Sequence, residues 1–483
     1  MDIIVRVALC VSSALLVIMA ANYYIHMLQL EGYFVSQFLR HLFARVKKPS
    51  LIFKKTVQKK PLVYTARIKR LYFVLAVLVL LIETGIFFLA EIEELLVLIA
   101  VAAVPLTSPL VLLAAITAIP MEKAVAAYFI NDAKKKLRER PDLKIIALTG
   151  SYGKTSTKFI LSTLLSEKYA CLTPPASYNT TLGVVRVIRE RLQRDDQIFI
   201  CEMGSRHIGD IKEICDLVHP DHAIITSIGP QHLDTFLSIE GVKKGKFELI
   251  EGIKPDGIAV FASSNSDILE LYDKTENEKY TAGFRSKDDL RAENIVSCSS
   301  GSAFTLVYGD EKIECSTLLL GKHNIQNILV ASMMTLKMGL TLKEIQRGIS
   351  KLKPVEHRLQ IVAKSPVTII DDAFNSSPNG AAAALEVLGS FTGRRIIVTP
   401  GFVELGKEED RYHMELGKRI GVNADIAVLV GIKRTEKIKE GIAGSNCQVY
   451  QVASLNEATQ LLEKITVSGD TVLFENDLPD NYE

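Results

Sequence analysis

The chain has 483 residues, enough for two or three domains. Hydrophobic residues make up 48% of it and the mean hydropathy is +0.20, which is high for a soluble protein and favours membrane spans. A formal net charge of +2 gives no sign of nucleic-acid binding, and we expect no nucleic-acid partner. The seven cysteines are scattered without C-x-x-C spacing, which favours reduced cytosolic thiols over a disulfide framework or a zinc site.

Three apolar stretches occupy most of the first 120 residues, at 3–25, 71–90 and 95–119. Each reaches the length of about 20 residues that a helix needs to cross a bilayer. We therefore expect a transmembrane helix within 1–30 and a transmembrane hairpin over 71–120. A cleaved signal peptide is the alternative for the first stretch, although it has no clear small-residue cleavage site. Buried helices of a soluble domain are the alternative for the other two, which stand almost back to back.

The segment 31–70 between these stretches is rich in lysine and arginine, whereas the short connection 91–94 has neither. The positive-inside rule places the basic segment in the cytoplasm, together with everything after residue 120. The sequence thus predicts a multi-pass protein of the cell membrane with cytoplasmic catalytic domains. Within 35–46, apolar residues recur at helical spacing among basic ones, which predicts an amphipathic helix on the membrane surface. A helix packed on the soluble domain is the alternative.

A charged linker, 121–142, precedes a long region in which apolar strand-like runs alternate with helical stretches. This alternation predicts an α/β fold with a mainly parallel sheet. In such sheets ligands bind at the carboxyl ends of the strands, so the residues after each predicted strand are the candidates for function.

The strand predicted over 144–149 runs directly into Gly150-Ser-Tyr-Gly-Lys-Thr-Ser156 and then a helical stretch. Gly150 and Gly153 let backbone amides approach a phosphate, and the helix N-terminus adds positive potential. Lys154 can reach the β and γ phosphates, and Thr155 can hold Mg²⁺. Leu148 stands where the usual phosphate-loop pattern has its first glycine. The sequence predicts binding of ATP and Mg²⁺ here, with Ser156 completing the loop.

Two further predicted strands end in polar groups. Glu202 follows the strand over 197–201, and His232 follows the strand over 223–228. A carboxylate at the end of a neighbouring strand can hold Mg²⁺ in enzymes with a phosphate loop. Taken singly, an acid after a strand is usually a helix cap, and a lone histidine is usually a structural hydrogen-bonding group. Phosphate-binding, acidic and imidazole groups after three strands of one sheet favour a site.

The loop T-G-x-x-G-K-T-S, without a first glycine, resembles that of the Mur ligase family, whose members use ATP to join a carboxylate to an amine in bacterial cell-wall synthesis. The resemblance covers about residues 144–417 and is strongest to the family's MurF branch, which adds D-alanyl-D-alanine. Other segments resemble family motifs in the same order: Tyr178–Gly183, Glu202–Gly204, Ile228–Leu233, Lys246–Glu248, Gly321–Asn327, Pro354–Gln360 and Asp371–Pro378.

The resemblance implies a role for a residue in each segment. Substrate contacts are implied for Tyr178, Asn179 and Thr180, nucleotide contacts for Asn324, Asn327, Arg358 and Asp371, and two Mg²⁺ ions for Thr155, Glu202, His232 and Lys246. In the family, the lysine corresponding to Lys246 is often carbamylated, which would give a carboxylate that bridges the metals. Lys154, Glu202, His232 and Lys246 are the implied catalytic residues. From spacing alone, Lys246 would be a surface lysine in a basic run with Lys243 and Lys244.

The chain also departs from the family pattern. Residues 1–140 stand where Mur ligases have a soluble domain that holds the UDP part of the precursor. Thr399–Gly406 has Gly401 in place of an acid, although Glu404 and His413 remain as expected substrate contacts. Near the C-terminus, V-L-F-E-N-D begins at Val472 where a basic V-L-V-K-G-S run is usual. The resemblance predicts a central ATP-binding domain over 143–355 and a Rossmann-like C-terminal domain over 356–483.

These observations predict a membrane-anchored, ATP-dependent amide ligase. Its partners would be ATP, a carboxylate on a glycan or lipid-linked precursor, and an amino acid or dipeptide. One alternative is the MurF activity itself, which adds D-alanyl-D-alanine to UDP-N-acetylmuramoyl-tripeptide. A second is a membrane ATPase that drives transport, and a third is a catalytically inactive scaffold.

Overall fold

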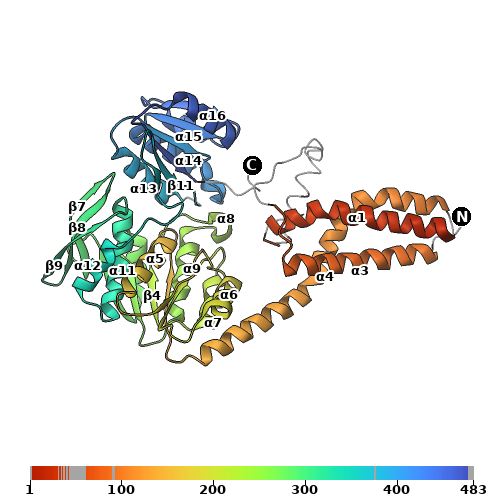
Figure 1. Ribbon diagram of the computed structural model, residues 1–483, viewed down its shortest axis with the longest axis horizontal. Coiled ribbons are helices and arrows are strands. Elements are labelled where there is room, and N and C mark those ends of the chain that lie inside the picture. The colour runs from red at the N-terminus through yellow and green to blue at the C-terminus, as the bar shows by residue number, and fades with distance from the viewer. Residues whose placement is uncertain are drawn as a thin grey trace. The chain divides into compact units, whose positions relative to one another are not determined.

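The computed structural model describes residues 3–30, 61–89, 93–374 and 377–476, with a few single residues between 32 and 42 (Figure 1). The chain divides into two compact units, Met1–Phe129 and Ile130–Leu478. The first is helical and the second carries two β-sheets. Most of the amphipathic helix expected over 35–46 lies outside the described residues.

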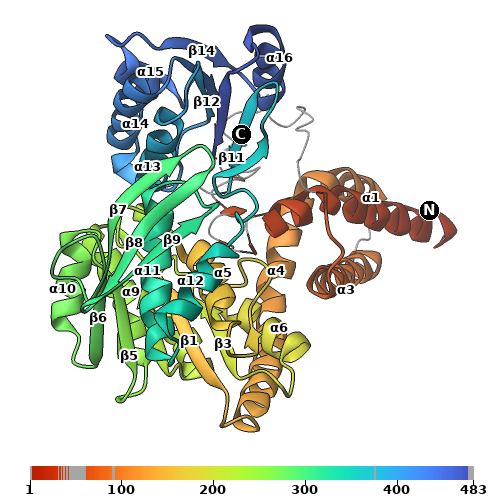
Figure 2. The same cartoon turned by 60° about the vertical axis from the view of Figure 1, so that its left-hand side comes forward.

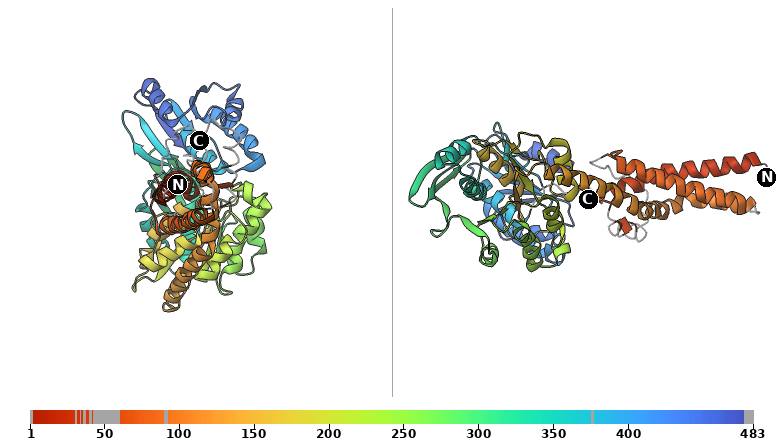
Figure 3. Two further views of the ribbon diagram at one scale, coloured as in Figure 1. Left: turned by 90° about the vertical axis from the view of Figure 1, so that its right-hand side faces the viewer. Right: turned by 90° about the horizontal axis from the view of Figure 1, so that it is seen from below.

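Among the described residues, the first unit contains helices α1 (Ile3–Leu30), α3 (Ala66–Leu89) and most of α4 (Glu93–Arg138), which run alongside one another (Figures 1 and 3). Their shared core includes Ala21 of α1, Leu75 of α3 and Val111 of α4. Among the described residues, Val11–Leu30 and Leu106–Arg138 are long and apolar enough to cross a membrane by length and composition.

Helix α4 continues through most of the segment expected as a linker over 121–142 and ends at Arg138. Residues 121–137 contain mainly alanine, lysine and other good helix formers, with no glycine or proline to stop the helix.

The second unit begins with a nine-stranded sheet in the order β2-β3-β1-β4-β5-β6-β7-β8-β9, counted over the described residues. Its strands are β1 (Lys144–Thr149), β2 (Cys171–Leu172), β3 (Ile198–Glu202), β4 (His222–Ile225), β5 (Ile258–Ala262), β6 (Glu278–Gly283), β7 (Leu290–Cys298), β8 (Gly301–Tyr308) and β9 (Glu311–Thr317). Pairing is parallel from β2 to β7, and β8 and β9 add an antiparallel edge (Figure 2). The central strands are almost entirely apolar because helices cover both faces.

The helices of this part are α5 (Lys154–Leu165), α6 (Thr181–Arg191), α7 (Asp210–Val218), α8 (Leu233–Phe236), α9 (Ile239–Gly252), α10 (Ser266–Lys274), α11 (Lys322–Lys337) and α12 (Leu342–Ser350). Helix α11 is buried along almost its whole length and packs against α5. This packing fixes the helix that starts at the phosphate loop.

A six-stranded sheet follows in the order β10-β11-β15-β12-β13-β14, again within the described residues. Its strands are β10 (Gln360–Ala363), β11 (Thr368–Asp372), β12 (Arg395–Thr399), β13 (Ile426–Val430), β14 (Gln448–Val452) and β15 (Thr471–Glu475). The helices are α13 (Pro378–Gly389), η2 (Gly406–Glu408), α14 (Glu409–Asn423), α15 (Glu436–Ile442) and α16 (Leu455–Ile465). Strand β10 is antiparallel to β11 and the other pairs are parallel. The α/β fold with parallel-dominated sheets is therefore confirmed.

Candidate active site

The phosphate loop connects β1 to α5 at the carboxyl edge of the first sheet. Gly153 has a φ of +81°, and a Cβ placed there would come within 2.6 Å of Asn327 Oδ1. A Cβ on Gly150 would come within 2.1 Å of Thr226 Oγ1. Both positions therefore require glycine, which keeps the backbone open. No side chain caps α5, so its first backbone N–H groups can receive an anion.

The Lys154 side chain lies over this loop, and its Nζ donates a hydrogen bond to the Gly150 carbonyl. Burial of its ammonium group lowers the pKa of Lys154 to about 8, and the Glu202 carboxylate opposes this effect. An arriving phosphate would supply the negative charge that the buried ammonium lacks, so the lysine is prepared for an anionic ligand.

Glu202 lies at the centre of the site and is 1% exposed. Its carboxylate accepts a hydrogen bond from Thr155 Oγ1 at 3.1 Å and another from Asn179 Nδ2 at 3.0 Å. Lys158 Nζ lies 3.2 Å from the same carboxylate and donates to the Ala176 carbonyl at 2.8 Å. The fold thus brings the phosphate loop and the predicted substrate loop together on one acid, because β1 and β3 are parallel neighbours.

A threonine hydroxyl next to a carboxylate is a suitable pair of hard oxygen donors for Mg²⁺. The described residues contain no group of three or more His, Cys, Asp or Glu side chains that could hold a metal. Thr155 and Glu202 therefore fit one Mg²⁺ that takes its other ligands from nucleotide phosphates and water, as this ion usually does. The second ion remains a prediction.

Lys246 lies on α9 and is 1% exposed, so the surface-lysine alternative is wrong. Its Nζ donates to Ser205 Oγ at 2.9 Å. Burial, together with the positive charge of Lys154, holds the pKa of Lys246 well below its ordinary value. A buried neutral amine can react with carbon dioxide, but carbamylation remains a prediction.

His232 precedes α8 as its N-cap residue and contacts Glu404 of the C-terminal domain. Its Nδ1 lies 2.5 Å from Glu404 Oε2, and Glu404 Oε1 lies 3.2 Å from Arg206 Nη2. Burial lowers the pKa of His232, although the Glu404 carboxylate opposes this. With Nδ1 engaged, Nε2 is the nitrogen left for a ligand. The pair borders a hollow that is also lined by Pro230, Gln231, Ser377, Pro378, Phe402, Val403 and Leu405.

His413 lies on α14 and is 1% exposed. Its Nε2 accepts the Phe402 backbone N–H at 2.8 Å, which places the imidazole behind the loop that carries Glu404. The Oγ1 of Thr180 caps α6 by accepting the Gly183 N–H, and the Tyr178 ring lies beside Arg186. Substrate contacts by His413, Thr180 and Tyr178 remain predictions.

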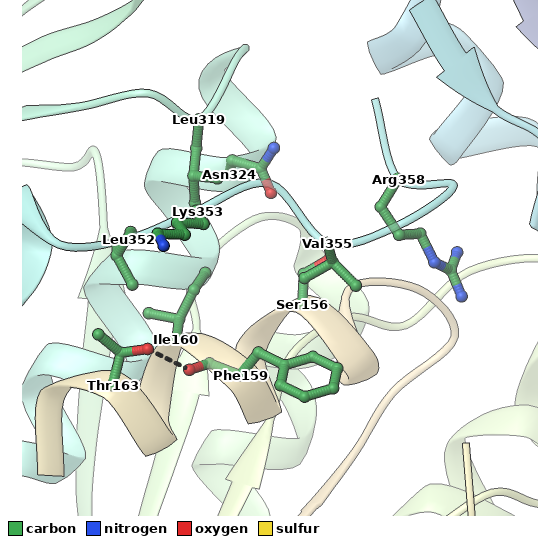
Figure 4. Close-up of a pocket in the computed structure, with 10 residues that line it drawn as sticks. All are labelled: Ser156, Phe159, Ile160, Thr163, Leu319, Asn324, Leu352, Lys353, Val355 and Arg358. Carbon is green, nitrogen blue, oxygen red and sulfur yellow. Dashed lines mark hydrogen bonds between the residues drawn. The ribbon is translucent and has the colours of Figure 1, made fainter. Parts of the chain in front are cut away.

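A groove beside the phosphate loop suits the rest of a nucleotide (Figure 4). It is lined by Ser156, Phe159, Ile160, Thr163, Leu319, Asn324, Leu352, Lys353, Val355 and Arg358. In Figure 4, Ile160 and Leu352 lie close together on one side, and Arg358 lies apart on the other. The groove thus combines an apolar floor for a flat ring with a cation for phosphates.

Two other predicted nucleotide contacts lie outside the lining of this groove. Asn327 is next to Asn324 on α11, and Asp371 is on β11 of the C-terminal domain. Asn327 Nδ2 donates to Asn324 Oδ1 at 3.4 Å. Asp371 Oδ2 lies 2.6 Å from His357 Nδ1, and the Arg358 guanidinium lies 4.4 Å from the centre of the Phe374 ring. A ribose contact by Asp371 would have to share its carboxylate with His357.

Comparison with known proteins identifies the family. A model described as Mur ligase middle domain matches residues 148–335, and one described as Mur ligase, glutamate ligase domain matches residues 357–475. Together these ranges cover more than half of the chain. The chain belongs to the Mur ligase family. It is therefore an ATP-dependent amide ligase that uses Mg²⁺.

Similar proteins carry MurF names. The UDP-N-acetylmuramoyl-tripeptide–D-alanyl-D-alanine ligase of Haemophilus influenzae is 30% identical over 66% of this chain and 70% of its own length. The crystal structure of MurF from Acinetobacter baumannii has a TM-score of 0.67 and 27% identity, covering 73% of this chain and 77% of its own. MurF ligase from Thermotoga maritima, solved in complex with ADP, shares the fold with a TM-score of 0.66 at 24% identity over 73% and 80% of the two chains.

Two cations of this Mur ligase were not predicted from the sequence. Lys158 is fully buried against Glu202, and Arg206 pairs with Glu404. The one available signal for Lys158 was a second lysine one helical turn after Lys154, on a helix whose other residues are all uncharged. Arg206 gave no such signal, because its partner comes from the other domain.

Proposed function

We propose that this Mur ligase joins D-alanyl-D-alanine, or a closely similar dipeptide, to the carboxylate of a muramoyl peptide. The observation that carries the proposal is the sharing of Glu202 between Thr155 of the phosphate loop and Asn179 of the predicted substrate loop. A centre common to both loops suits transfer of a phosphoryl group from ATP to a substrate carboxylate. The names of the MurF relatives support the choice of dipeptide and peptide acceptor.

In the first proposed step, an oxygen of the substrate carboxylate attacks the γ-phosphorus and ADP leaves, giving an acyl phosphate. Both reactants are anions, so their approach needs fixed positive charge. Lys154 and the N-terminus of α5 hold the phosphates, while Thr155 and Glu202 would hold Mg²⁺, which adds charge compensation. Lys158 lies 3.2 Å from the buried Glu202 carboxylate and gives it a partner of opposite charge.

In the second proposed step, the dipeptide amine attacks the acyl carbon, inorganic phosphate leaves and the nitrogen loses a proton. Glu404 brings the C-terminal domain against His232, and Arg206 holds the other oxygen of this carboxylate. In this proposal the amine would enter through the hollow that Glu404 and His232 border. Carbamylated Lys246 as a ligand of a second ion is part of this proposal.

We further propose that the first unit anchors the enzyme in the cell membrane, with the catalytic domains in the cytoplasm. Large apolar side chains on its helices are exposed, among them Met19 at 70%, Phe73 at 68% and Leu80 at 66%. Soluble monomers rarely expose apolar surface on this scale, whereas a bilayer would cover it. The basic segment 31–70 supports the cytoplasmic side.

A second candidate concerns the carrier of the carboxylate, which would be a lipid-linked or polymeric glycan instead of a UDP-sugar. Both family models begin after the helical unit, at residue 148 or later, so neither accounts for residues 1–147. A substrate held at the membrane would not need a separate domain for a soluble nucleotide sugar.

The test uses the full chain in nanodiscs with MgATP and D-alanyl-D-alanine. One reaction receives UDP-N-acetylmuramoyl-tripeptide and a parallel one receives the same tripeptide on a polyprenyl-linked muramoyl carrier. Phosphate release and product mass are measured, with Lys154→Met as the inactive control. A dipeptide adduct in either reaction supports the ligase, and the faster substrate identifies the carrier. Phosphate release that does not depend on the dipeptide would instead favour a membrane ATPase.

A further inference from the structure

Two segments in which the chain departs from the family pattern contact each other at the carboxyl edge of the C-terminal sheet. Thr399 ends β12 and Glu475 ends β15, and these strands are parallel neighbours. Thr399 Oγ1 donates to Glu475 Oε2 at 2.7 Å, and Glu475 is 0% exposed. Asn476 Nδ2 donates to the Gly401 carbonyl at 2.6 Å. Hydrogen bonds therefore join the two segments that depart from the family pattern.

Hydrogen bonds with Thr399, His413 and Asn476 fix the turn at 399–402. Thr399 Oγ1 also accepts the Gly401 N–H at 3.1 Å, so both backbone polar groups of Gly401 are occupied. Gly401 has a φ of +79°, and a Cβ there would come within 2.8 Å of His413 Nε2. The same nitrogen of His413 accepts the Phe402 N–H. The acid that the family pattern has at residue 401 would not fit this turn.

Glu404 follows the turn with a φ of +64°, a conformation that is uncommon for glutamate. Such a backbone persists only when its surroundings determine it. Here the surroundings are the fixed turn on one side and the contacts of Glu404 with His232 and Arg206 on the other.

We propose that Glu475 and Asn476 are positioning residues, which fix the 399–402 turn so that Glu404 meets His232 and Arg206. They would act on amide formation through Glu404 and leave nucleotide binding untouched. The inference rests on the proposed function in one respect, because the ligation reaction is the assay in which its effect is measured.

The main variant is Asn476→Gly. Asn476 has a φ of +64°, which glycine adopts without strain, so the variant removes the hydrogen bond to Gly401 without straining the backbone. We expect kcat for ligation of UDP-N-acetylmuramoyl-tripeptide and D-alanyl-D-alanine to fall about tenfold, the effect of one buried hydrogen bond, with MgATP affinity within about twofold of wild type. Asn423→Gly is the matched control, because Asn423 Nδ2 also donates to a backbone carbonyl of this domain, that of Arg419 at 2.9 Å.

A double-mutant cycle with Glu404→Gln separates positioning from a general structural role. If Asn476 acts through Glu404, Asn476→Gly causes no further loss of kcat in the Glu404→Gln background. An equal loss in both backgrounds, or an unchanged kcat in the single variant, overturns the proposal. Thr399→Ser should keep the activity that Thr399→Val loses, because only serine retains the hydroxyl.

The same cycle is also measured as thermal stability of the apo protein, which needs no substrate. Shifts in Tm that are not additive support the coupling of Asn476 to Glu404, and additive shifts overturn it. If wild-type protein is inactive with this substrate pair, the proposed function fails, and the stability cycle still decides the positioning role.

Discussion

The carboxyl edges of the two sheets are built from different chemistry. At the first sheet, β1 and β3 lead into Lys154, Thr155, Lys158 and Glu202, and buried charges neutralise each other. At the second sheet, the strand ends carry Thr399 and Glu475, with Asn476 next, and hydrogen bonds to a backbone turn predominate. A buried charge requires a partner of opposite sign, so the first edge can bind anions and a metal. The second edge shapes a loop, which presents Glu404 to His232 and Arg206 of the first domain.

The largest expected effect tests the charged edge. Lys154→Met removes the cation of the phosphate loop, and we expect the ligation rate to fall on the order of 10³-fold. Lys274→Met is the matched control, since Lys274 is exposed and pairs with Glu270 on the surface of α10. Phosphate release measures both variants, and a Lys154→Met enzyme with a tenth of the wild-type rate would contradict this role.

The second prediction asks whether the charges of this edge depend on one another. Lys158→Met leaves Glu202 buried without its cation, and we expect the free energy of unfolding to fall by roughly 3 kcal/mol. Adding Glu202→Gln should restore part of this stability, because the unpaired charge is then gone. Lys212→Met, which breaks an exposed pair with Asp216, should change stability by less than about 0.5 kcal/mol. Thermal unfolding of wild type, Lys158→Met, Glu202→Gln, the double variant and Lys212→Met tests the prediction, and strict additivity of the two single changes would refute it.

The third prediction tests the contact between the two edges. Glu404→Gln weakens the hold on the His232 imidazole, and loss of such a supporting carboxylate usually costs about 10–100-fold. We expect this loss in kcat, while MgATP affinity measured by calorimetry stays unchanged. Glu415→Gln is the control, because Glu415 pairs with Arg419 on an exposed face of α14. A weaker MgATP affinity in Glu404→Gln would show that the carboxylate serves the nucleotide.

The smallest expected effect is a pH dependence at the edge of the C-terminal sheet. Burial raises the pKa of Asp372 to about 6, and nearby Arg358 opposes this. An unfolded chain has an aspartate pKa of about 3.9, so between these values the folded protein holds a proton that the unfolded chain has lost. Stability must therefore fall as pH rises from about 4 through 6, by an amount on the order of 2 kcal/mol.

Asp372→Asn should remove this decline while keeping an acceptor for the Leu359 N–H. The measurement is the difference in Tm between wild type and variant from pH 4 to 7, with the exposed Asp310→Asn as control. A difference that does not change with pH would mean that Asp372 keeps an ordinary pKa.

The predictive value of the sequence differed between these two edges. The phosphate loop was predicted with its glycines, Lys154 and Thr155, because its residues are neighbours in the chain. Glu202 could be proposed because a strand ends there, and parallel strands share an edge. Lys246 could not be told from a surface lysine by spacing, since its burial depends on how α9 packs.

The C-terminal side was less accessible to sequence reasoning. The departures at Gly401 and after Val472 were visible, but nothing in the chain indicated that they contact each other. A substrate contact by His413 remains a prediction, and nothing in the chain indicated that its Nε2 accepts the Phe402 N–H. The membrane anchor predicted from the apolar stretches remains a prediction.

The sequence by itself determined the family, the phosphate loop and the alternation of strands and helices, because each depends on short-range patterns. Only the tertiary structure decided which side chains share a site. It paired His232 with Glu404, 172 residues apart, and placed Lys158 against Glu202. Such pairings depend on strand order and helix packing, and a buried charge or backbone group must find its partner wherever the fold brings one.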